Sequence, residues 1–253
     1  MNTNPYNPYD TYSRNQGQPY SPYQQPAPFD GYGVTYSQDA RQSLLSKVLT
    51  LLSFSLAMAG LGLFVGLQLL AAGLGGFWIP AIILEFIVLI ALMITTRKLP
   101  NATMLNLGLL YLFTFTSGMT ISTIIAAYAA AGAATAIYQA LALTGVLTIG
   151  LGMYAWSTKR NLSFLGPILF IGLLTVVVAS IFSLFFATGP LSFIIALVSV
   201  ALFSGFIVYD IQRVKFTENT LSAAILLTVS LYLDILNLFL SLLRLFGYGS
   251  NDD

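Results

Sequence analysis

The fold of this chain is decided by long apolar stretches such as residues 221–246, which read LSAAILLTVSLYLDILNLFLSLLRLF. Asp234 and Arg244 are the only charged residues in that stretch, and the rest is mostly Leu, Ile and Phe. A helix needs roughly 20 mainly apolar residues to cross the hydrocarbon core of a bilayer. Residues 221–246 are therefore predicted to form a membrane-spanning helix. The alternative is a segment that re-enters and leaves on the same side, which the basic Arg244 near its end would favour.

Six further stretches of this kind come before it, at residues 44–74, 77–96, 103–126, 134–156, 162–188 and 191–212. The whole chain is 57% hydrophobic and 8% charged, whereas a soluble domain carries about 25% charged residues. The stretches are apolar on every side, unlike the alternating strands of a membrane β-barrel. The chain is thus predicted to be an all-α membrane protein with seven transmembrane helices over residues 42–253, and with the lipid bilayer as its main partner.

Residues 1–41 have a composition of their own. They hold seven of the 14 tyrosines and six of the 10 prolines, with many Asn, Gln and Ser and few aliphatic side chains. Such a segment cannot bury enough apolar surface to offset the entropy of folding. It is predicted to be a disordered N-terminal tail. Two interpretations stay open, a solvated leader without a specific partner and a tyrosine-rich docking segment for another protein.

Apart from Arg244 in the seventh stretch, the basic residues from Arg41 onward fall at the first span and on every second connection after it. They are Arg41 and Lys47, Arg97 and Lys98, Lys159 and Arg160, and Arg213 and Lys215. The connections in between carry no Lys or Arg. This alternation follows the positive-inside rule and predicts a cytoplasmic N-terminus.

The chain contains no cysteine and no histidine, and its formal net charge is +1. The absent cysteines exclude disulfides and thiolate-held metals, and the absent histidines remove the base of a serine hydrolase. The small net charge argues against nucleic acid as a partner. An intramembrane aspartyl protease is disfavoured because no glycine stands beside Asp234, where those proteases carry Gly-x-Gly-Asp. We expect no enzymatic activity and no tightly bound cofactor.

Three of the nine acidic residues lie inside predicted spans: Glu85 in the second, Asp210 near the end of the sixth and Asp234 deep in the seventh. A carboxylate in a span costs several kcal/mol unless it is paired, hydrated or protonated, so each is a candidate functional residue. Structural alternatives exist. Asp210 could be a helix-end charge paired with Arg213, and Asp234 could be a neutral acid that hydrogen-bonds between helices. Glu85 has no partner that the sequence identifies.

Polar residues recur along the seventh span at spacings of four, three, four and three: Ser230, Asp234, Asn237, Ser241 and Arg244. On a helix of about 3.6 residues per turn these residues form one narrow stripe. A polar stripe does not face lipid. The C-terminal helix is therefore predicted to be central in the bundle, with the stripe lining a polar path.

If Asp210 and Asp234 approach each other in a poorly hydrated site, both cannot ionise at low cost. They would then share one proton and titrate as a unit. Without that proton the pair offers hard oxygen ligands of the kind that Ca²⁺ prefers. Acid would protonate the pair and expel the ion. Two residues that meet in this way would make a proton-gated cation path with a transient calcium site.

Four segments resemble the Bax inhibitor-1 family, within a likeness that covers residues 42–247. They are residues 117–120 (SGMT), 158–163 (TKRNLS), 203–210 (FSGFIVYD) and 231–239 (LYLDILNLF). The last two, whose aspartates stand 24 residues apart, are the specific part. The chain departs from the family at Asn161, where the usual residue is Asp, and in its long tail.

The resemblance implies a seven-helix fold with the last helix surrounded by the others, and a pH-sensitive calcium leak through a bacterial plasma membrane. It implies that Asp210 and Asp234 are the pH sensor and that a basic residue at the end of the second helix latches onto Asp210. The nearest match to that residue is Arg97, and the alternative is that Thr96 stands at its position. Glu85 resembles a glutamate of the second helix in the relatives. Some members of the family are described instead as regulators of a membrane protease or of stress and cell-death responses. A regulatory binding protein is therefore the alternative to a channel.

Overall fold

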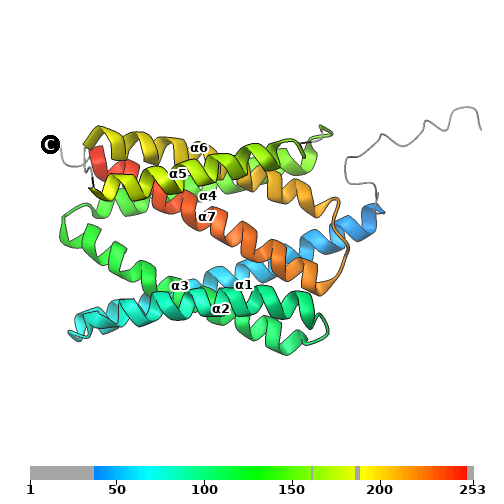
Figure 1. The fold of residues 1–253 in the computed structure, drawn as a ribbon, viewed down its shortest axis with the longest axis horizontal. Helices are drawn as coiled ribbons and strands as arrows, with labels where there is room; N and C mark the ends of the chain where they lie inside the picture. The colour runs from blue at the N-terminus through cyan, green and yellow to red at the C-terminus, as the bar shows by residue number, and fades with distance from the viewer. Residues whose placement is uncertain (1–36, 161, 186–188, 250–253) are drawn as a thin grey trace, which may run out of the picture. The chain divides into compact units, whose positions relative to one another are not determined.

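The computed structural model describes residues 37–160, 162–185 and 189–249. Within these ranges the chain forms seven long α-helices and one 3₁₀ turn, η2 (Figure 1). Their bounds are α1 (Gln38–Ala71), η2 (Gly75–Phe77), α2 (Trp78–Lys98), α3 (Thr103–Ala130), α4 (Ala134–Ser157), α5 (Leu165–Phe185), α6 (Gly189–Val214) and α7 (Leu221–Gly249). Each of the seven long helices has the length and apolar composition needed to cross a bilayer. The prediction of an all-α protein with seven transmembrane helices is confirmed.

The helices begin and end close to the predicted boundaries, with the largest difference at the start of α1. This helix begins at Gln38, because the hydroxyl of Ser37 accepts a hydrogen bond of 3.3 Å from the N–H of Ala40 and so caps the first turn. The helix thus starts inside the segment predicted as tail. The rest of that segment, residues 1–36, lies outside the described residues, and its disorder stays a prediction.

Basic and uncharged connections lie at opposite ends of the bundle. We call the end at which α1, α3, α5 and α7 begin the basic end, since the alternating Lys and Arg residues of the connections gather there. At the opposite end the chain turns at Gly73 and Gly132, whose φ angles are both 77°. Glycine is needed at these two positions because side chains rarely tolerate that left-handed backbone.

The C-terminal helix lies at the centre of the helices. α7 packs against α1, α2, α3, α4 and α6, while α5 packs on the outside of α6. Figure 1 shows α7 running diagonally between a group formed by α1, α2 and α3 and a group formed by α4, α5 and α6. Buried side chains follow the whole of α7, from Ala224 and Ile225 near its start to Leu242 and Leu243 near its end. The predicted central position of this helix is confirmed.

Small residues allow α1 and α3 to pack closely. A methyl group added at Gly62 would overlap the backbone carbonyl of Phe115, and one added at Gly118 would overlap the backbone carbonyl of Ala59. Both glycines are buried between the helices. Such contact between backbones is the usual function of small residues in membrane helix pairs. The two glycines therefore set the spacing of the group that packs on one side of α7.

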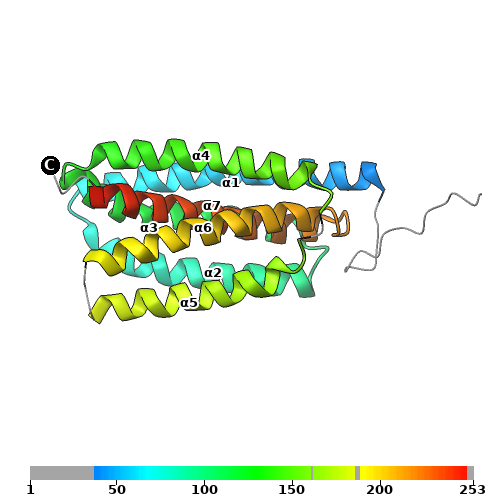
Figure 2. The ribbon, with the colours of Figure 1, turned by 90° about the horizontal axis from the view of Figure 1, so that it is seen from above.

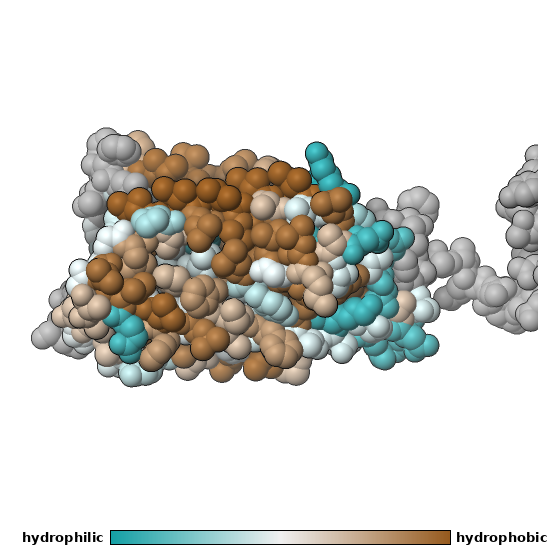
Figure 3. All heavy atoms as spheres, turned by 90° about the horizontal axis from the view of Figure 1, so that it is seen from below, coloured by the Kyte–Doolittle hydropathy of each residue, from teal (hydrophilic) through white to brown (hydrophobic). Residues whose placement is uncertain are grey.

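The outer surface of the helices is apolar over most of their length. Figure 3 shows hydrophobic residues along the helices and hydrophilic residues mainly at the basic end. Ile149 on α4 and Ile171 on α5 are each 65% exposed, for example. A continuous apolar surface of this size is unstable in water and suits contact with lipid. The surface and the helix lengths together show an integral membrane protein.

Candidate functional site

The two aspartates predicted to form a pair do meet. Asp210 in the last turns of α6 and Asp234 in the middle of α7 are only 3% and 7% exposed. Their carboxyl groups interact with each other directly. One oxygen of each, Oδ2, is buried and has no hydrogen-bond partner among the described residues. The packing of α6 on α7 therefore places two carboxyl groups together with unused acceptor capacity.

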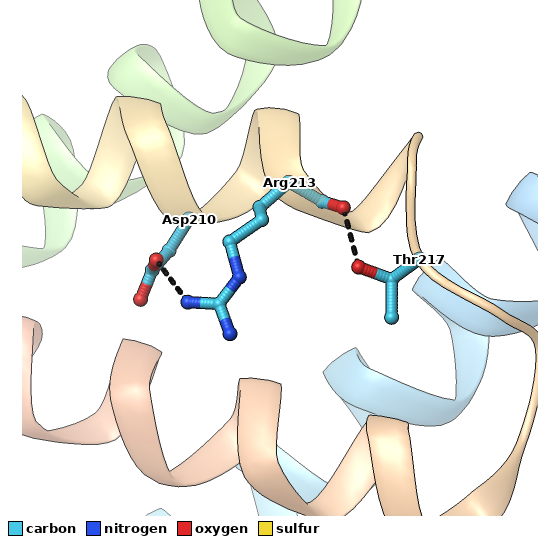
Figure 4. Close-up of polar contacts among 3 residues, drawn as sticks. All are labelled: Asp210, Arg213 and Thr217. Atoms are coloured by element: carbon cyan, nitrogen blue, oxygen red, sulfur yellow. Dashed lines mark hydrogen bonds and ion pairs between the residues drawn. The ribbon is translucent and has the colours of Figure 1, made fainter. Parts of the chain in front are cut away.

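A single arginine reaches this pair. Nη1 of Arg213 donates a hydrogen bond to Oδ1 of Asp210 at 3.3 Å, one turn along α6 (Figure 4). The side chain of Arg213 is 40% exposed, so its guanidinium connects the buried pair with the basic end. Ser230, one turn before Asp234 in the polar stripe, also hydrogen-bonds with Asp210. Both alternatives for Asp210, a helix-end ion pair and a carboxyl pair, are present together.

The charges at this site do not balance when both acids are ionised. Asp210 and Asp234 would then carry two negative charges against the one positive charge of Arg213. A buried net charge is strongly unfavourable. A shared proton or a bound cation neutralises it. The geometry thus makes the site either an acceptor for a proton or an acceptor for a cation.

The predicted latch residue, Arg97, lies elsewhere in this conformation. It stands in the last turn of α2 at the basic end, and its side chain is exposed. Among the described residues the ion pair of Asp210 is with Arg213. The neighbouring Thr96 is buried, and its hydroxyl has no hydrogen-bond partner in the part of the chain that the structure describes. A latch function of Arg97 therefore stays a prediction.

The outer part of the polar stripe lines a cavity. Asn237, Ser241 and Arg244 of α7 face a space of about 460 Å³ together with Ser180 of α5 and Ser199 of α6. This cavity, whose other lining residues are apolar, begins one helical turn beyond Asp234 and follows α7 toward the end opposite to the basic end. The stripe predicted from spacing thus lies beside a cavity of mixed polar and apolar lining, and its role as a polar path stays a prediction.

Glu85, for which the sequence identifies no partner, belongs to a separate cluster. Its Oε2 accepts a hydrogen bond of 2.8 Å from the hydroxyl of Thr120 on α3. The hydroxyls of Ser117, one turn earlier on α3, and of Tyr232 on α7 lie near Glu85, and both are buried without a hydrogen-bond partner among the described residues. Tyr232 precedes Asp234 by two residues and so lies on the other side of α7. The central helix therefore has polar clusters on two opposite faces.

The spacing of Ser117 and Thr120 was the signal that could have identified these partners. Three residues apart on a helix, they share a face and can meet one acceptor together. Nothing in the sequence pairs that face with α2, however. The contact depends on how α2 and α3 pack, and only the tertiary structure supplies it.

Lys215, directly after α6, connects the end of α6 to the end of α4 at the basic end. Its Nζ donates hydrogen bonds to the backbone carbonyls of Ala155 at 2.9 Å and Thr158 at 3.1 Å, and it lies 5.5 Å from the centre of the Trp156 ring. Unpaired carbonyls at a helix C-terminus favour a cation. Burial, and then the charge of Arg41, lower the pKa of Lys215. The lysine is thus held among α4, α6 and α1 at an electrostatic cost.

Two further side chains hold the connections around the site. The amide of Gln212 accepts from the N–H of Leu162 at 2.9 Å and donates to the carbonyl of Arg160 at 2.6 Å. Nζ of Lys47 donates to Oδ1 of Asn219 at 2.8 Å. The α4–α5 and α6–α7 connections are therefore fastened to the end of α6 and to α1, close to the aspartate pair. Sequence reasoning did not identify these contacts.

The aspartate pair supplies few ligands for a metal ion. Within the described ranges no group of three or more Asp, Glu, His or Cys side chains could hold a metal. Asp210 and Asp234 offer at most four oxygens, whereas Ca²⁺ takes roughly six to eight. An ion at this site would keep part of its water and be held weakly.

The chain is similar to a family of membrane proteins and to several uncharacterized proteins of bacteria. The family model described as inhibitor of apoptosis-promoting Bax1 matches residues 41–251. An uncharacterized protein of Helicobacter pylori is 34% identical over 86% of this chain and 94% of its own length. An uncharacterized protein of Campylobacter jejuni is 36% identical over 82% of this chain and 91% of its own length. An uncharacterized membrane protein of Vibrio cholerae is 38% identical over 61% of this chain and 70% of its own length.

Proposed function

The chain belongs to the Bax inhibitor-1 family, and from this premise we propose that it is a pH-sensitive cation leak channel with calcium as the transported ion. The observation that carries the proposal is the buried contact between Asp210 and Asp234, with Arg213 as their one cationic partner among the described residues. A pair that needs either a proton or a cation to be neutral can exchange one for the other when the pH changes.

The polar side of the cavity along α7 supports a route for the ion. Asn237 and Ser241 continue the stripe away from Asp234, and both lie beside the space of about 460 Å³. Their donors are used within α7: Nδ2 of Asn237 bonds to the carbonyl of Leu233, and Oγ of Ser241 bonds to the carbonyl of Asn237. Among the described residues these bonds leave Oδ1 of Asn237 and the lone pairs of the Ser241 hydroxyl as the oxygen atoms that could contact a cation. The route would run from this cavity past the aspartate pair to the basic end.

The pH dependence follows from competition at the pair. A cation is attracted when both carboxyl groups are ionised, because Arg213 neutralises only one of them. A proton on either carboxyl group removes that attraction. Acidification is therefore expected to lower calcium occupancy of the site and calcium flux.

The proposed orientation puts the basic end in the cytoplasm of a bacterium. The alternation of Lys and Arg along the connections supports this orientation through the positive-inside rule, and the similar proteins named above come from bacteria. The membrane would then be the plasma membrane. Accessibility of a cysteine placed at Glu218, in this cysteine-free chain, to a membrane-impermeant thiol reagent in intact cells tests the assignment.

Calcium uptake into liposomes that contain a calcium-sensitive dye tests the channel. Asp210→Asn and Asp234→Asn keep the size of the side chain and remove its charge. Each is expected to lower flux and to flatten its dependence on pH. Glu218→Gln is the matched control, because Glu218 is an exposed acid in the α6–α7 connection. Flux and pH dependence that stay unchanged in both asparagine variants would refute the mechanism.

A regulatory binding protein is the second candidate, and the composition of residues 1–36 favours it. That segment is rich in Tyr and Pro and precedes the cap of α1. Deletion of residues 1–36 keeps Ser37 and the helices. If partners captured by the whole protein are lost while calcium flux is intact, the tail serves a binding function. If both are unchanged, this second candidate fails.

A further inference from the structure

α1 and α4 lie on the same face of the helices, to either side of α7 (Figures 1 and 2), and no described residue of one has its Cα atom within 8 Å of a Cα atom of the other. The space between them, here called the α1–α4 groove, holds two cavities. The one near the basic end has a volume of about 380 Å³ and the one farther along has about 230 Å³. Ser53 lines the first and Leu56 the second, so about 4.5 Å of helix rise separates them. The two cavities are parts of one groove.

The cavity near the basic end has a polar wall. Gln42, Ser46, Thr50 and Ser53 line it from exposed positions on α1, opposite Trp156 of α4. α1 contains 34 residues, so it is about 51 Å long and exceeds the hydrocarbon thickness of about 30 Å. Its first turns therefore reach the level of lipid headgroups. Tryptophan is also common at that level.

Two basic residues lie next to residues of this polar wall. Lys215 lies over the ring of Trp156, and Arg41 precedes Gln42 in the first turn of α1. Arg41 and Lys215 are close enough for the charge of Arg41 to disfavour that of Lys215. In addition, Nε of Arg41 is buried without a hydrogen-bond partner among the described residues. An anion at this place would offset the repulsion, and basic pockets between membrane helices are known to bind anionic headgroups.

The cavity farther along is apolar. Leu56 and Gly60 of α1 and Leu141 of α4 form its rim, and Leu236 and Phe239 of α7 lie at its floor. Leu56 and Leu141 are 45% and 63% exposed, so the cavity is continuous with the surface that faces lipid. Apolar cavities of this kind stay dry, and an engineered one of about 150 Å³ holds a benzene molecule. The space of about 230 Å³ therefore admits part of a hydrocarbon chain.

We propose that the α1–α4 groove binds one anionic phospholipid of the leaflet on the basic side. Its phosphate lies at Gln42 and Ser46, and one acyl chain extends into the apolar cavity against α7. The lengths agree, because α1 rises about 15 Å from Ser46 to Leu56, which is half of the hydrocarbon thickness of about 30 Å. The groove matches this occupant at both ends, with charge at the headgroup and apolar walls at the chain.

Fluorescence quenching by lipids with brominated acyl chains tests the proposal. The chain has two tryptophans, so Trp78→Phe leaves Trp156 as the reporter of the headgroup end. A triple variant places the reporter at the floor of the apolar cavity, because it combines Trp78→Phe and Trp156→Phe with Phe239→Trp. The purified full chain is placed in nanodiscs with increasing fractions of brominated phosphatidylglycerol or brominated phosphatidylcholine. This measurement involves no ion flux, so it stands or fails separately from the channel proposal.

Two control reporters give the upper and lower limits of the quenching. Phe170→Trp lies on α5 at a position that is 59% exposed and reports ordinary contact with lipid, while Phe113→Trp lies in the core at 1% exposure and reports none. We expect half-maximal quenching of Trp156 at an anionic lipid fraction about fivefold lower than the zwitterionic one, as one extra charge contact implies. The Phe239→Trp reporter should be quenched as strongly as the Phe170→Trp reporter.

Filling the groove provides the matched variant. A side chain at Gly60 starts in open space, as does one at Gly150, which does not line the cavity. Gly60→Phe should abolish quenching of the Phe239→Trp reporter, and Gly150→Phe should leave it unchanged. Equal quenching of Trp156 by both lipids overturns the headgroup site. The acyl-chain site is overturned if the Phe239→Trp reporter is quenched as little as the Phe113→Trp reporter. The same lack of quenching is expected if a second copy of the chain covers the groove, and that result also overturns the lipid site.

Discussion

The hydroxyl of Thr120 donates a hydrogen bond of 2.8 Å to the carboxyl group of Glu85, joining α3 to α2 inside the transmembrane region. The bond is the hydrogen bond that Glu85 makes among the described residues. The three intramembrane acids therefore lie at two different places in the structure. Asp210 and Asp234 meet between α6 and α7, while Glu85 lies with α2, α3 and Tyr232 on the other side of α7.

The Glu85 contact predicts a loss of stability in Thr120→Val. The valine keeps the shape of the side chain but removes the donor, which leaves a buried acceptor unsatisfied at a cost of about 1–3 kcal/mol. The thermal unfolding midpoint in detergent should fall. Thr123→Val is the control, since the hydroxyl of Thr123 bonds only to the carbonyl of Thr120 in its own helix. An equal effect of both substitutions would contradict a specific bond to Glu85.

The single cation at the aspartate pair predicts a shifted pH response in Arg213→Gln. Removing the guanidinium leaves the two carboxyl groups without their positive partner and favours the protonated pair. The midpoint of calcium flux against pH should move upward by about one pH unit, a moderate shift because Arg213 is partly exposed. Arg160→Gln serves as the control at the same end. An unchanged midpoint in Arg213→Gln would show that the arginine does not act on the pair.

The close contact of α1 and α3 predicts that Gly118→Ala is destabilising. The added methyl group would overlap the carbonyl of Ala59, and overpacking of this kind costs about 1–3 kcal/mol. Gly108→Ala on the same helix has open space and should be neutral or slightly stabilising. Unfolding in detergent measures both. Similar stability of the two variants would show that α1 and α3 can move apart at little cost.

Lys215 predicts a pH-dependent contribution to stability. Its pKa is lowered in the folded protein by burial and by Arg41, so between that lowered pKa and the ordinary value of about 10.4 the unfolded chain binds more protons than the folded one. Stability in this window must rise with pH through Lys215. Lys215→Met removes this contribution. The difference between the unfolding midpoint of the unmodified protein and that of the variant should therefore change in favour of the unmodified protein between pH 8 and about pH 10. Unfolding midpoints that depend on pH in the same way in both proteins would contradict the burial of the lysine.

The composition and spacing of the sequence were sufficient for the seven helices and for the polar stripe of α7. Apolar stretches of the length of a bilayer have few alternatives, because an unpaired backbone is too costly in hydrocarbon. The stripe from Ser230 to Arg244 follows from the helical period alone. The acid that the sequence places deepest, Asp234, is indeed buried on the central helix.

Which polar groups meet was decided by the tertiary structure. The sequence places Asp234 about 20 Å into its helix and Asp210 within about 6 Å of the end of its own, so their contact depends on how α7 packs against α6. The same holds for Glu85 with Thr120. A helix has a side-chain period that can be read from its sequence, but the angle and depth at which two helices cross depend on side chains of both. The sequence by itself determined which acidic residues lie inside the membrane-spanning helices and therefore need a partner. Only the packing of the helices decided which polar group each of them contacts.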